Sequence, residues 1–233
     1  RAGATRVEVA GNLKYDLVPE PALLARGRRW RAALARPVLL AANTREGEEA
    51  ALLRCWSARI AAAPAGAPRP LLLIVPRHPQ RFDAVAALVA AAGLTLARRS
   101  AWGDEPPAGA AEVWLGDSLG ELPLYYAAAD VALLGGSFEA LGGHNLIEAA
   151  ACGCPLVVGP HMFNFTAATE AALAAGAVEQ VGDLEAGVRR ALALLEAPAA
   201  AARSAWSARA LAFAAEHRGA ADRMARALLA LRP

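Results

Sequence analysis

Short apolar runs alternate with longer alanine-rich stretches along most of the chain. Seven of these runs are β-branched or leucine-rich, and most are nearly continuous in hydrophobic residues, which is typical of parallel strands that are covered on both faces. The stretches between them have the length and spacing of helices. The pattern predicts an α/β fold, a doubly wound parallel sheet of Rossmann-like type. The predicted strands are 37–42, 71–75, 94–97, 112–115, 130–134, 155–158 and 177–181, and the predicted helices are 46–63, 79–92, 120–128, 144–152, 165–175 and 183–196.

The two ends of the chain lack strand patterns. Residues 20–35 predict a basic helix before the first strand, and residues 199–232 predict two helices that are broken near His217–Gly219. Residues 1–17 have the character of a linker. Because the sequence begins with Arg1, we expect it to be part of a longer protein.

Composition and charge exclude some classes of function. The 233 residues are 56% hydrophobic and carry a formal net charge of +2, which is too small to indicate nucleic acid as the main partner. The five tryptophans are scattered along the sequence, so no stacking platform for bases is evident. No apolar run is long enough for a membrane span. Three cysteines make no disulfide framework and favour a reducing, cytoplasmic setting.

Polar residues follow the strands, where an open parallel sheet binds its ligands. The segment after 71–75 contains Arg77 and His78 between two prolines. A guanidinium offers a fork of donors that suits a phosphate, and an imidazole can add another. The alternative is that Arg77 caps the edge of a strand and that His78 begins a helix. Position alone leaves both interpretations open.

The stretch 141–155, LGGHNLIEAAACGCP, joins permissive backbone to a helix start. Gly142 and Gly143 would let the backbone approach a ligand closely. Asn145 lies at an N-cap position, where free N–H groups favour an anion, and Glu148 could accept from ribose hydroxyls. A purely structural capping box of Asn145 with Glu148 is the alternative, and the two roles are compatible.

Two further motifs are better explained without a ligand. His144, His161, Cys152 and Cys154 do not have a usual zinc spacing, so we predict no metal site and expect the cysteines to be packing residues. The basic helix at 20–35 could touch anionic lipid or phosphate, but we predict that its arginines form a solvated face. These arginines are Arg26, Arg28, Arg29 and Arg31.

Five motifs together resemble a known family. They are GNLKYD, NTREGEE, VPRHPQRF, GDSLGELPLYYAAADVALLGGS and GGHNLIEAAACGCPLVVGPHMFNF. In this order they resemble the 3-deoxy-D-manno-octulosonic acid (Kdo) transferases of lipopolysaccharide synthesis, over residues 11–17 and most of 38–182. The resemblance implies the C-terminal half of a GT-B glycosyltransferase. Residues 1–17 would then be the interdomain linker at the end of an N-terminal domain, and 18–233 the donor-binding domain with its C-terminal helices 199–232.

The resemblance also implies an activity. The family transfers Kdo from CMP-Kdo to a lipid A precursor, with inversion and without a metal or other cofactor. Its catalytic base and its membrane association belong to the N-terminal domain. We therefore expect no catalytic residue in this chain, no transfer by the chain alone, and a parent enzyme at the cytoplasmic face of the bacterial inner membrane. The expected partners are CMP-Kdo, the lipid A precursor and, through the other domain, the membrane surface, with no nucleic acid.

The family motifs place donor binding on three loops. Here Leu119 stands where the family usually has methionine, and Arg45 stands where it more often has histidine; the prolines of its Asn-Pro-Leu-Glu-Pro segment are absent. The implied CMP-binding residues are Arg77, His78, Leu119, Gly120, Glu121, Asn145, Leu146, Ile147 and Glu148, with Thr44, Arg45, Gly142 and Gly143 as supporting residues.

Two other functions remain open from the residues. One is a different GT-B enzyme, a nucleotide-sugar transferase or epimerase, since such enzymes also carry a glutamate that contacts ribose. The other is a non-catalytic nucleotide-binding module that kept the fold.

Overall fold

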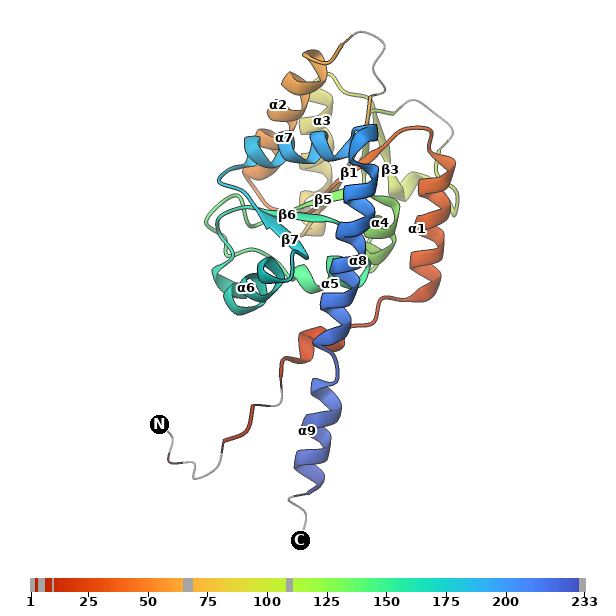
Figure 1. The fold of residues 1–233 in the computed structure, drawn as a ribbon. Coiled ribbons are helices and arrows are strands. Elements are labelled where there is room, and N and C mark those ends of the chain that lie inside the picture. The colour runs from red at the N-terminus through yellow and green to blue at the C-terminus, as the bar shows by residue number, and fades with distance from the viewer. Residues whose placement is uncertain (1–2, 4–6, 10, 65–68, 108–110, 231–233) are drawn as a thin grey trace.

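The structure, a computed structural model, describes residues 3, 7–9, 11–64, 69–107 and 111–230. Within these residues seven strands form one parallel sheet in the order β3-β4-β2-β1-β5-β6-β7 (Figure 1). Each predicted strand is confirmed: the five inner strands are buried between two helical layers, and the edge strands β3 and β7 are partly exposed. The strands are β1 Val38–Thr44, β2 Leu71–Pro76, β3 Leu96–Arg98, β4 Val113–Leu115, β5 Val131–Leu134, β6 Leu156–Val158 and β7 Val178–Gln180.

Helices fill the stretches between the strands, as predicted. Those inside the α/β unit are α2 Glu48–Ala61, α3 Phe82–Ala91, α4 Leu122–Ala128, α5 Leu146–Ala151, α6 Thr166–Ala174 and α7 Leu184–Leu195. The flanking helices are α1 Pro21–Ala33, α8 Ala200–Glu216 and α9 Ala220–Leu229, and the break between α8 and α9 lies at the predicted place. Short 3-10 turns are η1 Leu13–Asp16, η2 Pro79–Arg81, η3 Arg99–Ala101, η4 Phe163–Phe165 and η5 Ala197–Ala199.

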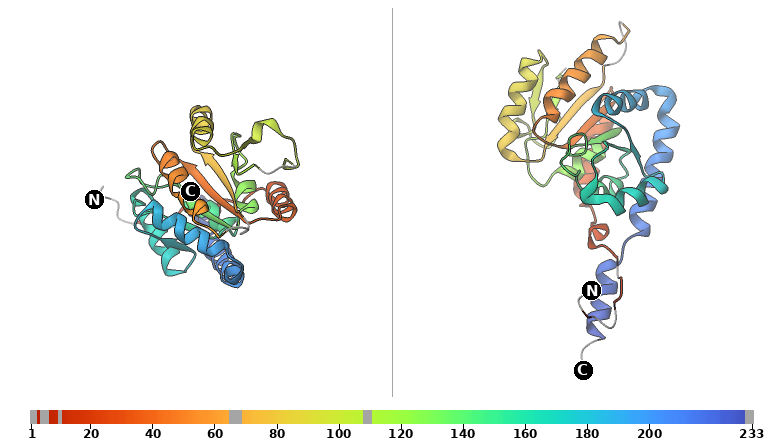
Figure 2. Two further views of the ribbon diagram at one scale, coloured as in Figure 1. Left: turned by 90° about the horizontal axis from the view of Figure 1, so that it is seen from above. Right: turned by 90° about the vertical axis from the view of Figure 1, so that its left-hand side faces the viewer.

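The sheet divides the core into two apolar layers, and Figure 2 shows from above the helices that flank the sheet. Alternate residues of β1 enter opposite layers, with Leu39 and Ala41 on one face and Leu40 and Ala42 on the other. Side chains of α2, α3 and α7 cover the first face, and those of α1, α4, α5 and α8 cover the second. This arrangement confirms the doubly wound α/β fold.

Three of the five tryptophans cluster in space, whereas Trp56 and Trp206 pack in the apolar layer on the other face of the sheet. Trp30 of α1 stacks on Trp102 with 5.0 Å between ring centroids, and Trp114 of β4 meets both rings edge-on at 6.2 and 4.7 Å. Trp30 and Trp114 are buried and Trp102 is half-buried. The cluster is therefore a packing device between α1 and the β3–β4 edge of the sheet, and it offers no exposed platform for bases.

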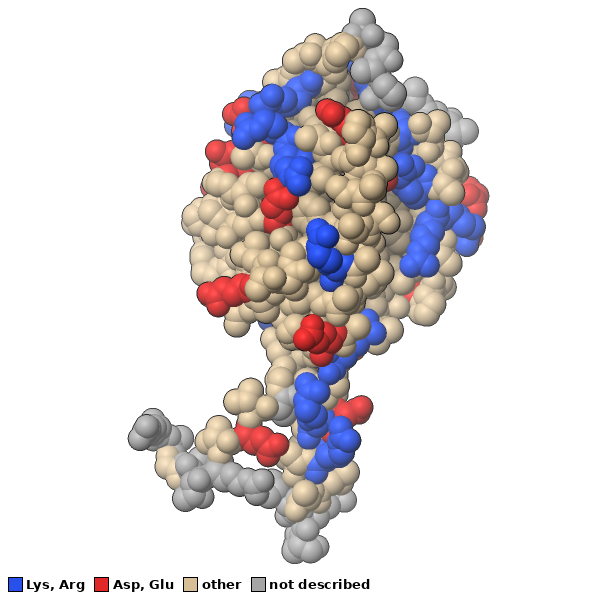
Figure 3. Space-filling model, in the orientation of Figure 1, with Lys and Arg blue, Asp and Glu red and all other residues tan. Residues whose placement is uncertain are grey.

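The basic helix α1 is only partly the solvated face that its sequence predicts. Arg26 pairs with Asp104 and Glu121, and Arg31 pairs with Asp130 at 2.8 Å. Arg28 and Arg29 are exposed. On the face shown in Figure 3, arginines gather over α1 and along α9, but carboxylates are interspersed with basic side chains elsewhere. In the part of the chain that the structure describes, no helix has the length and apolar character needed to cross a membrane.

The two ends of the chain meet outside the sheet. α9 extends away from the body of the molecule and packs on η1 (Figures 1 and 2). The Asp16 carboxylate accepts hydrogen bonds from the first backbone N–H groups of α9, from Gly219 and Ala220 (3.3 Å) to Oδ1 and from Ala221 (2.6 Å) to Oδ2. Of the two predicted terminal segments, 1–17 and 199–232, residues 1–2, 4–6, 10, 231 and 232 lie outside the described residues.

Candidate functional site

The strand order places one crevice at the centre of the sheet. β1 lies between β2 and β5, so the chain leaves β1 toward one side and later returns on the other. The carboxyl ends of such neighbouring strands form the usual ligand site of an open parallel sheet. The loops that follow β1, β2 and β5 carry Thr44–Arg45, Arg77–His78 and the segment 135–145.

A buried glutamate ties the first of these loops to the third. Glu48, in the first turn of α2, is 2% exposed. Its Oε2 accepts from the backbone N–H groups of Gly136 (2.8 Å) and Arg45 (2.9 Å), and its Oε1 accepts from that of Phe138 (3.2 Å). Burial raises the pKa of Glu48, and the three hydrogen bonds oppose that rise. Sequence reasoning missed this role, although two consecutive acidic residues at a helix start were a signal for it.

The neighbouring Glu49 ties the first loop to the second. It is fully buried, and its carboxylate accepts from the Thr44 hydroxyl at 3.2 Å and pairs with Arg81 at 3.2 Å. The Thr44 carbonyl accepts from the backbone N–H of Arg77 at 3.0 Å. Thr44 is itself buried, so it supports the loop from within; its predicted support of donor binding stays a prediction.

Small residues let the loops after β1, β5 and β6 touch. A Cβ on Gly135 would overlap the Asn43 carbonyl oxygen, and a Cβ on Gly159 would overlap the Ser137 carbonyl oxygen. The buried Ser137 hydroxyl donates to the Leu134 carbonyl and accepts from the Gly159 N–H at 2.8 Å. Three strand ends are thereby locked into one floor beneath the crevice.

Gly142 and Gly143 allow other side chains of the protein to pack closely against their backbone. Gly142 and Gly143 have φ values of +86° and +75°, which favour glycine. The space beside Gly142 is taken by the Asn164 side chain, and that beside Gly143 by Met162. Their close approach is therefore to the β6–α6 connection, which folds against this loop.

Asn145 is the N-cap of α5, as predicted. The Asn145 side chain caps the helix by accepting from the Ile147 N–H at 3.1 Å. Leu146 and Ile147 have fully buried side chains, so only their backbone is near the crevice. Because α5 has six residues, its dipole is small, and charge for an anion must come mainly from side chains.

Arg45, Arg77 and His78, from the loops after β1 and β2, act electrostatically on His144. A buried Nε2 of His144 lies under the Gly136 position, and Arg45 Cγ lies beside the same glycine. Burial, followed by the charges of Arg77, Arg45 and His78, lowers the pKa of His144 to about 4. The imidazole is therefore neutral at physiological pH, and its Nε2 has no hydrogen-bond partner among the described residues.

Arg45, Arg77 and His78 differ from the other basic side chains at the same edge of the sheet, which are paired with carboxylates. Arg26, Arg81, Arg98 and Arg99 all form ion pairs. Within the described residues Arg45, Arg77 and His78 have no side-chain ion pair or hydrogen bond. Half-buried Glu148 likewise accepts no side-chain hydrogen bond there. Burial raises the pKa of Glu148, and the charge of Arg77, which also acts on His144, opposes that rise.

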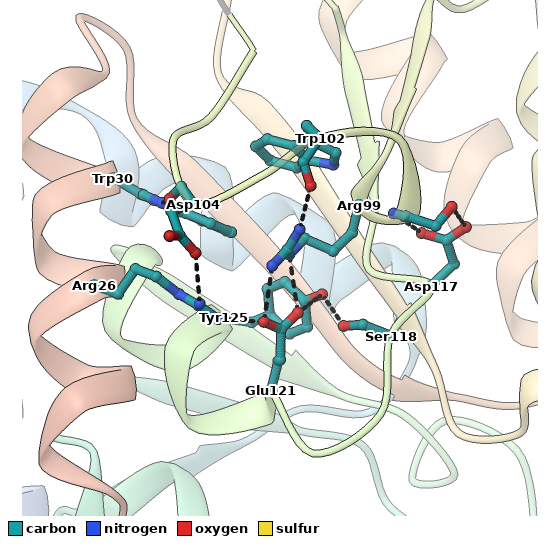
Figure 4. A network of polar contacts seen from close by, with 10 residues as sticks. Arg26, Trp30, Arg99, Trp102, Asp104, Asp117, Ser118, Glu121 and Tyr125 are labelled. Atoms are coloured by element: carbon teal, nitrogen blue, oxygen red, sulfur yellow. Dashed lines mark hydrogen bonds and ion pairs between the residues drawn. The ribbon is translucent and has the colours of Figure 1, made fainter.

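The loop after β4 brings the remaining predicted residues to this edge, but with Glu121 turned inward. Leu119 is 74% exposed, and Gly120 has a φ of +77° with open space beside it. The Glu121 carboxylate instead pairs with Arg99 and Arg26 (Figure 4). The backbone of this loop and the exposed Leu119 side chain are free to face a ligand, whereas the Glu121 carboxylate is not.

The cysteines take the packing role that the sequence predicts. Cys152 and Cys154 are free and buried beside α5, and burial raises the pKa of the Cys152 thiol to about 12. Over the described ranges, no three His, Cys, Asp or Glu side chains are grouped so that they could hold a metal ion.

Comparisons with known proteins place the chain among glycosyltransferases. No protein-family model matches it. It is 50% identical to the 3-deoxy-D-manno-octulosonic acid transferase of Bordetella pertussis over 98% of this chain and 52% of that protein. It is 40% identical to the Haemophilus influenzae enzyme of the same name over 69% of this chain and 36% of that protein. The chain thus spans about half the length, or less, of these relatives.

Solved structures agree with this similarity. The C-terminal CMP-Kdo binding domain of WaaA from Acinetobacter baumannii superimposes with a TM-score of 0.71 and 30% identity, over 83% of this chain and 98% of that one. HepE from Anabaena, in complex with UDP-glucose, superimposes with a TM-score of 0.61 at 16% identity, over 99% of this chain and 59% of that one. The second likeness concerns the fold alone.

Proposed function

Because the chain belongs to the 3-deoxy-D-manno-octulosonic acid (Kdo) transferase family, we propose that it is the donor-binding half of such a glycosyltransferase. The donor in this proposal is CMP-Kdo. The proposal is supported by the likeness to the WaaA domain, which is described as binding CMP-Kdo, over nearly the whole of that domain.

One observation on this chain carries the proposal. Most charged groups at the carboxyl edge of the sheet are paired with each other, yet Arg45, Arg77 and His78 have no side-chain partner among the described residues, and their charges act on a neutral His144. An unpaired, half-buried carboxylate, Glu148, lies near Arg77. Cations without carboxylates are suited to an anion, and a carboxylate without donors is suited to sugar hydroxyls. A nucleoside monophosphate ester presents both.

The parts of the donor can be assigned to these groups. Arg77 and His78 would hold the phosphate, and Glu148 would accept hydrogen bonds from the ribose. Arg45 would supply a second permanent charge, which matters because CMP-Kdo carries a sugar carboxylate in addition to its phosphate. The backbone of Leu119–Gly120 would line the nucleoside side of the crevice.

The reaction that this supports is inverting transfer to a hydroxyl of a lipid A precursor. The acceptor oxygen forms a bond to the anomeric carbon, the bond from that carbon to the phosphate oxygen breaks, and CMP leaves with the electron pair. Arg77 and Arg45 would stabilise the charge on the departing phosphate. No metal or cofactor is needed in this scheme. We expect the base that takes the acceptor proton, the acceptor site and the contact with the cytoplasmic face of the inner membrane to belong to the rest of the longer enzyme.

Calorimetric titration of the purified chain with CMP and with UMP tests the proposal. We expect saturable binding of CMP, weaker binding of UMP, and no Kdo transfer by the chain alone. Arg77→Ala and Glu148→Ala should each weaken CMP binding by roughly tenfold to a hundredfold, because each removes a charged partner of the ligand. Asn145→Ala should weaken it less, because Asn145 caps α5.

Arg59→Gln is the matched control, since Arg59 lies in the last turn of α2, outside the predicted donor-binding set, in an exposed pair with Glu185. Its CMP affinity should equal that of the unaltered chain. A folded chain without CMP binding, or with equal losses in Arg59→Gln and Arg77→Ala, would overturn the assignment. Tighter binding of UMP than of CMP would point instead to another nucleotide-sugar enzyme of this fold, and Kdo transfer by the chain alone would refute the inactivity of the isolated half.

A further inference from the structure

Glu121 is held by two arginines from different parts of the chain. Arg99 of η3 donates through Nε to Oε2 and through Nη2 to Oε1, both at 2.9 Å. Arg26 of α1 donates to Oε1 as well. The three side chains are between 12% and 19% exposed. Both carboxylate oxygens therefore lie inside a largely dry network (Figure 4).

The pKa of Glu121 reflects this pairing. Burial alone would raise it, but hydrogen bonds from Arg99 and Ser118 and the charges of both arginines lower it. The carboxylate is thus ionised at neutral pH and fully occupied by protein. It cannot serve as a free acceptor for a nucleoside.

The loop that precedes Glu121 is anchored on both sides of an exposed tip. Upstream, Asp117 accepts from Arg98 (2.7 Å) and from the hydroxyl and N–H of Ser100 (2.7 and 2.8 Å). Ser118 shares a hydrogen bond of 2.5 Å with the Tyr125 hydroxyl. Downstream, Glu121 is fixed by its arginines. Leu119 and Gly120 form the tip between these anchors and are exposed.

The arginines themselves are fixed by the tryptophan cluster. Arg99 Cζ lies 5.5 Å from the centre of the Trp30 ring and 5.7 Å from that of Trp102, and its Nη1 donates to the Trp102 carbonyl at 2.6 Å. Arg26 Cζ lies 5.8 Å from the Trp30 ring. Stacked guanidinium groups hold a defined plane. The aromatic cluster therefore orients the two arginines, and the arginines in turn hold Glu121 and the loop that precedes it.

We propose that Arg26 and Arg99 are positioning residues for donor binding, which act by holding Glu121 so that the Leu119–Gly120 backbone keeps the shape that receives the nucleotide. The inference rests on the proposed function, because the ligand of this loop is the donor. In this proposal the Glu121 carboxylate does not contact the ligand; it binds Arg26 and Arg99 and faces away from the ligand. It also gives α1 a part in the site, although none of its side chains belongs to the predicted donor-binding set.

The experiment compares variants of the full chain by CMP titration, thermal unfolding and amide hydrogen exchange over 118–121. Glu121→Gln and Arg99→Gln should each weaken CMP binding by about tenfold. Combining them should cost little more than the larger single loss, because both break one interaction. Exchange at the loop amides should rise in both variants. Arg26→Gln should give a smaller loss, since the two bonds from Arg99 remain.

Glu179→Gln is the control. It breaks a bidentate pair of similar geometry, with Arg190 at 2.8 and 3.0 Å, on the other edge strand of the sheet. Because the Arg190 and Glu179 side chains are 41% and 38% exposed, we expect a smaller change in the unfolding temperature and no change in CMP affinity. If Glu121→Gln and Arg99→Gln bind CMP as the unaltered chain does, or if Glu179→Gln loses as much affinity, the positioning role is refuted. An unaltered chain that does not bind CMP would instead refute the proposed function.

If Arg99→Gln fails to fold, Arg26→Gln decides the matter, because it leaves the Arg99 pair in place. Unchanged affinity and unchanged loop exchange in that variant would refute the role of Arg26.

Discussion

Glu48 Oε2 accepts a hydrogen bond of 2.8 Å from the backbone N–H of Gly136, which lies 88 residues further along the chain. The same oxygen accepts from Arg45 N–H. One carboxylate therefore joins the loops after β1 and β5, which flank the point where the strand order reverses. The cationic crevice depends on this link, since Arg45 lies on one of these loops and His144 on the other.

Glu48→Gln should destabilise the protein by about 1–3 kcal/mol, because the amide nitrogen cannot accept and leaves at least one buried N–H without a partner. Urea unfolding measures the loss. Glu46→Gln is the control, since the Glu46 side chain is 84% exposed and its contact with Arg81 is 3.4 Å long; its effect should stay within about 0.5 kcal/mol. Equal effects of the two substitutions would contradict the role of Glu48.

Gly27→Ala should loosen α1 from α4. Helix propensity favours alanine by up to about 1 kcal/mol, but a Cβ here would overlap the Leu124 carbonyl oxygen and come within 2.8 Å of Ala127 Cβ. Overpacking of this kind costs about 1–3 kcal/mol, so we expect a net loss of stability in urea unfolding. Gly103→Ala, where a Cβ meets open space, should leave stability unchanged. A stabilised Gly27→Ala variant would show that propensity outweighs the contact.

His144 should make stability depend on pH. Its pKa is about 4 in the folded chain against an ordinary value of 6.5. Between these values the unfolded chain binds a proton that the folded chain does not, so the free energy of unfolding falls as pH falls through this range. Above pH 6.5 neither state is protonated, and the contribution vanishes.

His144→Gln should remove this part of the pH dependence. On lowering the pH from about 7 to about 5, the unaltered chain should lose roughly 2 kcal/mol more than the variant. Urea unfolding at both pH values gives the difference, in which contributions of other groups, such as Glu48 and Glu148, cancel to first order. Parallel losses would mean that His144 is protonated in the folded chain at pH 5.

The fold was predictable because strands that are buried on both faces of the sheet form apolar runs in the sequence. The central strands are runs rich in Leu, Val, Ile and Ala, such as Leu71–Val75, and the glycines and prolines between the strands mark the turns. The place of the crevice followed from the same pattern, since polar residues come directly after these runs. Arg77, His78, Asn145 and Glu148 do lie at the carboxyl edge of the sheet.

Which of these residues are occupied by protein could not be predicted. Glu121 and Arg26 are 95 residues apart and Trp30 and Trp102 are 72 apart in the sequence, and no periodicity marks pairs that only the fold brings together. The sequence therefore suggested Glu121 as a ligand contact, Arg26 as a solvated charge and the tryptophans as unrelated. Glu48 and Glu49 could be assigned only to a motif, because the sequence does not show which hydrogen-bond donors surround a buried carboxylate.

The bond between Asp16 and the start of α9 also has a consequence for the order of folding. It closes a loop of more than 200 residues. Closing so long a loop costs conformational entropy before the hydrogen bonds can contribute any stabilisation. Of residues 220–229, all of which the structure describes, only Ala220 is buried, so α9 has little packing of its own to hold it. We expect it to become ordered after the sheet has brought η1 and the end of α8 together, and to be the first helix to open when the protein is warmed.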